Sequence, residues 1–137
     1  MSSSRTVLFV CQHGAAKSVI AAAYFNRLAR ECGIEARATS AGPEPDAAIP
    51  PRVRDGLAAD GLDPGVPVPR ALVRDDAASA WRVVTLGCEL GTLSPPGVAV
   101  ERWDDVPAVS AGFARARDVI VARVRTLLAT LPAGASA

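Results

Sequence analysis

Hydrophobic residues along this chain gather in short continuous runs that alternate with segments of helical spacing. Residues 6–10 form an unbroken apolar run, which is typical of a strand buried on both faces of a parallel sheet. Residues 36–40, 82–86 and 98–100 predict three further strands. The pattern therefore predicts four strands with longer connecting segments between them.

The connecting segments predict helices. Ile20, Tyr24 and Leu28 recur at helical spacing, and Cys32-Gly33 supplies a stop. A second helix is predicted over 50–59, with Pro50-Pro51 in its first turn. One face of a long C-terminal helix is traced by Phe113, Ala116, Ile120, Val124, Leu127, Leu128 and Leu131.

Strands that alternate with helices predict an α/β fold with a parallel sheet. The 137 residues suffice for one domain, 1–137, and no repeat or linker interrupts them. Residues 63–69 hold three prolines and a glycine, so they predict a loop. Residues 133–137 are expected to be frayed.

Composition and charge narrow the class of protein. Half of the residues are hydrophobic, which argues against disorder, and the formal charge is +1. That balance gives no electrostatic reason to expect nucleic acid or an anionic membrane as a partner. The longest apolar run, 19–25, is too short to span a bilayer, and the first residues show no signal peptide. A cytoplasmic protein is expected.

The three cysteines, Cys11, Cys32 and Cys88, are odd in number and widely spaced. This suits neither a disulfide framework nor a zinc site, and His13 is the sole histidine, so we expect no metal and no cofactor. His13 is interpreted as a loop side chain near the mouth of a site. Cys32 is interpreted as a small buried hydrophobic residue. For Cys88, the same interpretation and a role as a resolving cysteine fit equally well.

Cys11 stands where chemistry is expected, because it ends the first strand and a helix opens at Ser18. Ligands of parallel sheets bind beyond the carboxyl ends of strands, where helix N-termini direct free N–H groups outward. Amides, the helix dipole and the Lys17 cation would stabilise a thiolate, and Gly14 frees the backbone to curl around an anion. Ser18 either caps the helix or donates its hydroxyl to the sulfur. The oxyanion-binding loop is predicted to comprise Gln12, His13, Gly14, Ala15, Ala16 and Lys17.

Residues 7–18, Val-Leu-Phe-Val-Cys-Gln-His-Gly-Ala-Ala-Lys-Ser, resemble the signature loop of low-molecular-weight protein tyrosine phosphatases and thioredoxin-coupled arsenate reductases. That signature is a cysteine, five residues, an arginine, then serine or threonine. Residues 39–42 are similar to the Ser-Ala-Gly that follows the family's second strand, and 83–86 to its third strand. Residues 103–105 and 113–118 resemble the C-terminal stretch of the reductase branch. These collinear matches cover most of the chain.

The resemblance implies a three-layer sandwich in which helices flank a central four-stranded parallel sheet. It implies that Cys11 attacks phosphorus in a phosphoryl substrate, or arsenic in arsenate. Loop amides and Lys17 would hold the oxygens, and an aspartate on a later loop would protonate the leaving group. The implied partners are phosphate, arsenate or a phosphoryl substrate, together with an external thiol reductant for the arsenate reaction.

The chain departs from the family pattern in its signature loop and in its general acid. Lys17 replaces an arginine that grips two oxygens in a fixed fork, and Gly14 replaces an asparagine. The family's acid directly precedes a proline, whereas Val106 precedes the proline here and Asp104 and Asp105 lie upstream. Asp105 or Asp104 serves as the acid, or both form a solvated turn.

A third departure concerns the cysteine relay of the reductases. A reductase would place a cysteine where this chain has Gly87; Cys88 comes one residue later, and no cysteine follows it. Cys88 could resolve an adduct on Cys11, or an external thiol could do so.

Three functions therefore compete. The first is a phosphatase or arsenate reductase that depends on Cys11. The second is a degenerate module of the same fold that binds an oxyanion and turns it over poorly. The third, a nucleotide P-loop, fits least, because Ala16 and Cys11 occupy positions where that motif requires glycine.

Overall fold

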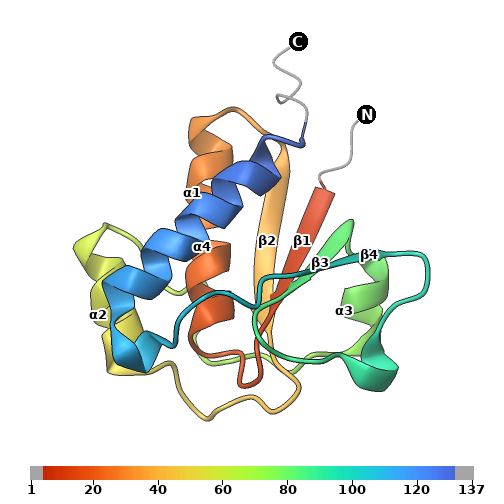
Figure 1. The fold of residues 1–137 in the computed structure, drawn as a ribbon, viewed down its shortest axis with the longest axis horizontal. Helices are drawn as coiled ribbons and strands as arrows, with labels where there is room; N and C mark the ends of the chain where they lie inside the picture. The colour runs from red at the N-terminus through yellow and green to blue at the C-terminus, as the bar shows by residue number, and fades with distance from the viewer. Residues whose placement is uncertain (1–4, 132–137) are drawn as a thin grey trace.

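The computed structural model describes residues 5–131, which form a four-stranded, all-parallel sheet flanked by helices (Figure 1). The strand order is β2-β1-β3-β4. The strands are β1 (Arg5–Val10), β2 (Ala36–Ala41), β3 (Arg82–Thr85) and β4 (Ala99–Arg102). The α/β fold with a four-stranded parallel sheet is confirmed: each predicted strand segment overlaps a strand, while the apolar run 19–25 forms part of a helix. The predicted fraying of 133–137 lies outside the described residues, as do the first four residues.

The helices are α1 (Lys17–Glu31), α2 (Pro51–Ala59), α3 (Arg74–Ser79) and α4 (Phe113–Leu128), with 3-10 turns η1 (Gly91–Leu93) and η2 (Val109–Ala111). The predicted helices correspond to α1, α2 and α4. Helix α3 was not predicted, since only Ala77 of its six residues is buried and the segment therefore shows no apolar periodicity. Across residues 5–131, no helix combines the length and the apolarity needed to cross a membrane.

The sheet divides the core into two clusters, because successive strand side chains point to opposite faces. Val7 and Phe9 pack with α1, α2 and α4, whereas Leu8 and Val10 pack with Ala77 of α3. Figure 1 shows this arrangement, with the three longer helices on one side of the sheet and α3 on the other. Trp103 adds to the first cluster, with its ring centroid 5.4 Å from that of Phe9.

The parallel register brings three loops to one edge of the sheet. Val10, the last residue of β1, lies opposite both Ala41 of β2 and Thr85 of β3. The chain segments that follow these strands therefore start side by side at the carboxyl edge, which is where parallel sheets bind ligands. The predicted site at Cys11 opens at this edge.

Candidate functional site

Cys11 follows β1 directly and lies at the amino end of α1. Its side chain is only 7% exposed, and its Sγ is 3.1 Å from the Oγ of the fully buried Ser18, where either atom can donate. The helix begins at Lys17 with Ala16 as its N-cap, one residue earlier than predicted. Ser18 therefore does not cap the helix, and its hydroxyl is left to face the sulfur.

The backbone around Cys11 presents a group of unused donors. Within residues 5–131, no acceptor bonds the backbone N–H groups of Gln12, His13, Ala15, Ala16, Lys17 and Ser18. The first N–H groups of a helix always lack intrahelical partners, and here the preceding loop adds more. Backbone N–H groups left free at the start of a helix can hold an anion.

Two glycines fix the shape of this loop. Gly14 has φ +59°, and a Cβ built on it would lie 2.8 Å from the backbone N of Gly42. A Cβ on Gly42 would lie 2.3 Å from the N of Gly14 and 2.6 Å from the O of Cys11. The loop after β1 thus packs directly against the backbone that follows β2, a separation that no larger residue allows.

The loop is also tied to residues 44–46. The carbonyl of Gln12 accepts from the N–H of Glu44 at 3.0 Å, and that of His13 accepts from the N–H of Asp46 at 3.1 Å. The side-chain amide of Gln12 donates to the carboxylate of Glu44 at 2.6 Å. Carbonyl groups of the loop are thereby turned outward and bonded, which leaves its amides to the inner side.

A cavity of about 350 Å³ opens above Cys11. Its apolar wall includes Pro50, Val53, Leu86, Ala108 and Val109. Its polar and charged lining includes Gln12, His13, Lys17, Asp46, Arg52 and Ser110. The structure thus brings Cys11 together with Gln12, His13, Ala15, Ala16 and Lys17 as lining residues, while Gly14 and Ser18 support the loop from behind.

The side chain of Lys17 crosses toward the segment after β3. A Cβ built on Gly87 would lie 3.7 Å from the Nζ of Lys17, and Gly87 has φ +79°. No ion pair of Lys17 exists within the described residues. Its charge is therefore free to meet an anion that the loop amides hold.

Asp104 and Asp105 do not line this cavity. Asp105 accepts from Arg123 of α4 at 2.7 Å, and this contact lowers the pKa of Asp105. Asp104 pairs with Arg102 at 3.0 Å. The same segment instead turns Ala108, Val109 and Ser110 toward Cys11.

Cys88 lies on the other face of the sheet from Cys11. It belongs to the cluster of Leu8, Val10 and Ala77, and its Sγ donates to the carbonyl of Val10 at 3.6 Å. Burial, followed by the charges of Cys11 and Glu89, raises the pKa of Cys88 to about 11. Cys88 is thus held as a protonated thiol at neutral pH.

The expectation that Cys32 is buried is wrong, because this cysteine is exposed just beyond the end of α1. All three cysteines are free thiols. Among residues 5–131, no group of three or more His, Cys, Asp or Glu side chains is arranged to hold a metal ion.

Three residues of the cavity went unnoticed in the sequence: Asp46, Arg52 and Ser110. None belongs to a local motif, and the segments that carry them are far apart in the chain. A partial signal existed at Arg52, since the Pro50-Pro51 pair predicts a helix start and places Arg52 in its first turn. For Asp46 and Ser110, only the folded chain shows the proximity to Cys11.

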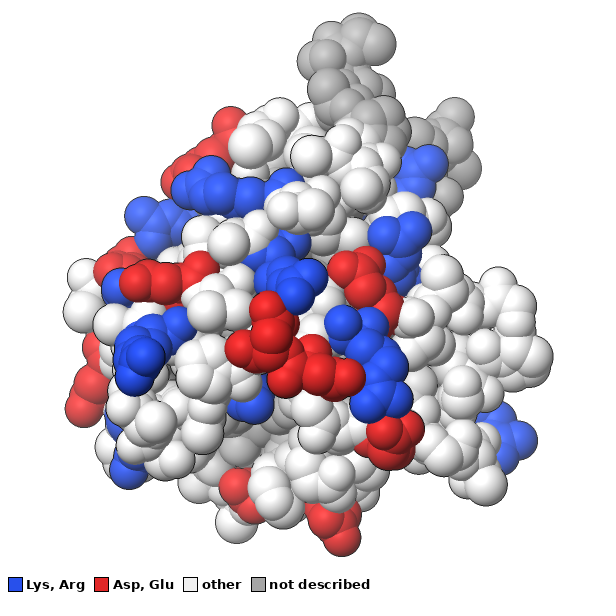
Figure 2. Space-filling model, in the orientation of Figure 1, with Lys and Arg blue, Asp and Glu red and all other residues white. Residues whose placement is uncertain are grey.

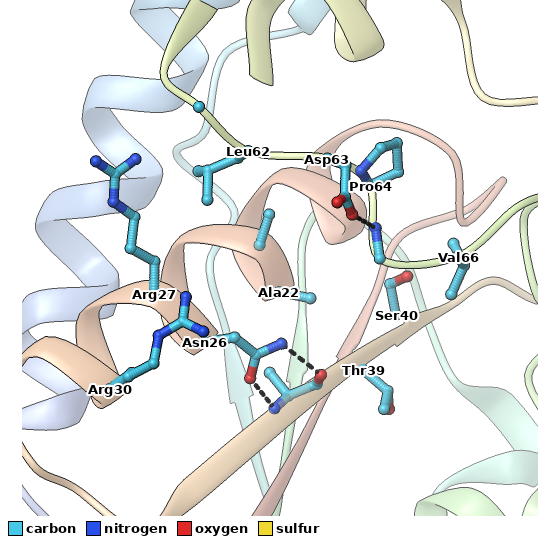
Figure 3. Close-up of a pocket in the computed structure, with 14 residues that line it drawn as sticks. Ala22, Asn26, Arg27, Arg30, Thr39, Ser40, Leu62, Asp63, Pro64 and Val66 are labelled. Carbon is cyan, nitrogen blue, oxygen red and sulfur yellow. Dashed lines mark hydrogen bonds between the residues drawn. The ribbon is translucent and has the colours of Figure 1, made fainter. Parts of the chain in front are cut away.

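A second cavity, of about 270 Å³, lies between α1, β2 and residues 61–66 (Figure 3). Its polar groups are mostly engaged already. The Asn26 amide both donates to the carbonyl of Ala38, at 3.0 Å, and accepts from its N–H, at 2.7 Å. Asp63 accepts from the N–H of Gly65, and Arg27 pairs with Glu31. These pairings hold the fold together, and the lining of this cavity contains neither cysteine nor histidine.

Charges of both signs are interspersed on the face drawn in Figure 2. Several pairs on the structure are close, such as Arg117 with Asp60 at 3.4 Å and Arg102 with Glu89 at 2.9 Å. The face in Figure 2 therefore carries no broad surface of one sign, such as a polyanion would require.

Comparison with known proteins starts from the sequence. Residues 6–92 match the family model described as low molecular weight phosphotyrosine protein phosphatase. No curated protein sequence matched the chain.

Solved structures extend the likeness over the whole domain. A thioredoxin-dependent arsenate reductase of Corynebacterium glutamicum is 28% identical, with a TM-score of 0.78, over 94% of this chain and 62% of its own. This chain therefore spans less than two thirds of that relative. An arsenate reductase of Archaeoglobus fulgidus is 30% identical, with a TM-score of 0.68, over 90% of this chain and 98% of its own. A low molecular weight protein tyrosine phosphatase from T. tengcongensis, 19% identical over 93% of this chain and 100% of its own, shares the fold with a TM-score of 0.83.

Proposed function

Because the chain belongs to the low molecular weight phosphotyrosine protein phosphatase family, we propose that it is a cysteine-dependent enzyme acting on a tetrahedral oxyanion. The substrate is a phosphoryl ester, which it hydrolyses, or arsenate, which it reduces with an external thiol. One observation carries the proposal: the buried Cys11 begins a loop in which the backbone N–H groups of residues 12–18, apart from that of Gly14, have no acceptor within residues 5–131.

In the phosphatase reaction the Cys11 thiolate attacks phosphorus, and the ester oxygen leaves with the electron pair of the broken bond. The loop amides hold the three equatorial oxygens, where charge accumulates in the transition state. The Ser18 hydroxyl, 3.1 Å away, stabilises the thiolate as attacking and as leaving group. Lys17 adds a positive charge but cannot make the bidentate hydrogen bonds of arginine. We therefore expect it to support binding of the oxyanion better than alignment of the transition state.

In the arsenate reaction the same thiolate displaces an oxygen from arsenic and forms a thiol–arsenate adduct. Reduction to arsenite takes two electrons, which Cys11 and one external thiol supply as they join in a mixed disulfide. Cys88 is less suited to this step, because it lies in the opposite cluster and burial keeps it protonated. A second external thiol then frees Cys11.

A thiolate of this kind works only while it is reduced. We therefore place the enzyme in a reducing, cytoplasmic setting.

A second candidate function is oxyanion binding with little turnover. It is favoured by one specific observation: Asp104 and Asp105, the candidate general acids, are paired with arginines and do not line the cavity. In this case the amides and Lys17 hold the anion, but no group there protonates a leaving oxygen.

The test compares wild type, Cys11→Ser, Lys17→Arg and the matched control Cys32→Ser, whose cysteine is exposed and outside the cavity. Two assays are run in reducing buffer: hydrolysis of p-nitrophenyl phosphate, and thiol oxidation that depends on arsenate. We expect turnover in one assay by wild type and Cys32→Ser, and none by Cys11→Ser.

Lys17→Arg separates the two candidates. Activity that appears only with Lys17→Arg would support the binding module. The fold would then be able to catalyse turnover with an arginine at position 17, but not with the native lysine. Equal activity of Cys11→Ser and wild type would refute a nucleophilic role for Cys11.

A further inference from the structure

We propose that His13 carries the proton of the reaction, giving it to the leaving group and later taking it from water, with Asp46 positioning the ring. This inference rests on the proposed function, and it supplies the acid that Asp104 and Asp105 do not provide. It is carried by the pairing of His13 with residues 44–46 and by the place of both side chains in the Cys11 cavity.

The hydrogen bonds of the ring determine which nitrogen is available. Nδ1 of His13 is 3.0 Å from the carbonyl oxygen of Glu44, and a carbonyl oxygen only accepts, so Nδ1 carries a hydrogen. Nε2 has no partner within residues 5–131. The imidazole is thus held at one nitrogen and free to exchange a proton at the other, which is the arrangement of a general acid and base.

Asp46 orients the ring and balances its charge. Its Oδ1 is 3.5 Å from Nδ1 of His13, and its backbone N–H donates to the His13 carbonyl at 3.1 Å. The two residues are therefore joined through side chain and main chain together. A carboxylate that holds the far nitrogen of a catalytic histidine is a recurrent device in enzymes.

The depth of the groups in the cavity fits an in-line reaction. Cys11 is 7% exposed at the base, while the side chains of His13 and Asp46 are 55% and 51% exposed at the mouth. A leaving group must depart opposite the attacking sulfur, hence toward the mouth. His13 lines the same cavity and is far more exposed than Cys11, so we place it on the side toward which the leaving group departs.

The other charged groups of the cavity are less suited to the role. Arg52 stays protonated in proteins, and Lys17 reaches toward Gly87 on the far wall of the loop. Asp46 is the remaining candidate, and its carboxylate is directed at the His13 ring. The variants His13→Gln and Asp46→Asn therefore distinguish the two residues as the proton donor.

His13 exchanges a proton with the reacting oxygens in two steps. The Cys11 thiolate forms the S–P bond, the P–O bond to the alcohol breaks, and the alcohol oxygen takes its electron pair and the proton from Nε2 of His13. Neutral His13 then accepts a proton from water as the water oxygen attacks phosphorus. The S–P bond breaks, which returns the thiolate, the imidazolium and inorganic phosphate.

The test exploits leaving-group dependence. Wild type, His13→Gln, Asp46→Asn and the control Asp118→Asn, on the outer part of α4, are assayed with p-nitrophenyl phosphate and with phenyl phosphate. Phenolate is the poorer leaving group and needs the proton more. We expect His13→Gln to lower kcat on phenyl phosphate about 10²–10⁴-fold and on p-nitrophenyl phosphate far less. Asp46→Asn should show the same selectivity with a smaller loss, and Asp118→Asn should match wild type.

Binding of inorganic phosphate separates chemistry from folding of the loop. His13→Gln should retain phosphate affinity within about threefold, because the backbone amides and not the imidazole hold the anion. Equal losses on both esters, or a larger selective loss in Asp46→Asn than in His13→Gln, would overturn the assignment while leaving Cys11 catalysis intact. Absence of ester hydrolysis by wild type would instead remove the phosphatase form of the proposed function, and this inference with it.

Discussion

Two buried cysteines follow neighbouring parallel strands, and they differ in the face of the sheet on which they lie and in the groups that surround each sulfur. Cys11 comes directly after β1, on the face of the sheet that α1 and α4 cover. Cys88 comes after β3, on the face that α3 covers. The alternation of side chains along a strand, together with the turn at Gly87, thus places one sulfur in each cluster.

The segments that follow the two strands complete the difference. After Cys11 a tight loop leads into the 15-residue helix α1, and N–H groups of the loop and of the first helical turn have no acceptor within residues 5–131. After Cys88 the chain forms only the three-residue turn η1, and the sulfur meets the carbonyl of Val10. Burial next to donors favours a thiolate, whereas burial next to an acceptor favours a thiol. The element that follows each strand therefore determines which groups lie near the cysteine: free N–H groups for Cys11 and a carbonyl group for Cys88.

The largest expected effect comes from Gly42→Ala, which disrupts the packing of the Cys11 loop against the backbone that follows β2. The added methyl group would lie 2.3 Å from the N of Gly14, so backbone must move. We expect a loss of about 1–3 kcal/mol in the free energy of unfolding and loss of oxyanion binding, measured by denaturant titration and phosphate titration. In the control Gly65→Ala no atom lies near the new methyl group, so only the strain of φ +79° should appear. Unchanged phosphate binding by Gly42→Ala would contradict the close packing.

The next effect concerns Cys88 and pH. Since its pKa is raised to about 11, the thiolate fraction is small below that pH and rises about tenfold per unit as pH approaches it. At pH 8 we expect iodoacetamide to label Cys88 at least about 100-fold more slowly than the exposed Cys32, as followed by peptide mass spectrometry. Comparable rates for the two cysteines would show that Cys88 is not held as a thiol.

A smaller effect is expected from Ser18→Ala, which removes the hydroxyl beside Cys11. A hydrogen bond to a charged group contributes about 1.5–3 kcal/mol, so alkylation of Cys11 at pH 7 should slow at least about tenfold. The rate at Cys32 in the same protein serves as the internal control. A Cys11 rate equal to that of wild type would mean that the 3.1 Å contact does not stabilise the thiolate.

The smallest effect is expected on the Cys88 side, at Thr85. Its Oγ1 is the one buried side-chain oxygen or nitrogen without a hydrogen-bond partner among residues 5–131. Thr85→Val removes this unpaired group with little change of shape, so the free energy of unfolding should stay equal or rise by about 1 kcal/mol. A clear loss of stability would show that the hydroxyl is bonded in solution, for instance by water.

Much of this architecture could be predicted because its signals are local. Continuous apolar runs mark the strands, and helical periodicity marks α1 and α4. The loop 11–18 was identifiable because the nucleophile, the glycine, the cation and the serine all lie within one short segment.

The features that could not be predicted depend on distant parts of the chain. The contacts of Asp46 with the Cys11 loop arise from the packing of two turns, and Asp105 is drawn away by Arg123, 18 residues later. Cys32 is exposed because it lies just past the last turn of α1, where a shift of one residue decides which way a side chain points. Periodicity alone does not fix such choices at element ends.

The bidentate contact of Asn26 with Ala38 has a consequence for how copies of this chain meet. Strand β2 is an edge of the sheet, and an exposed edge is a template on which a strand of another molecule can add. The Asn26 amide already occupies both the N–H and the carbonyl of Ala38, as a neighbouring strand would. An incoming strand finds the middle of that edge taken, so the addition of a strand at β2, and aggregation that would begin there, are disfavoured.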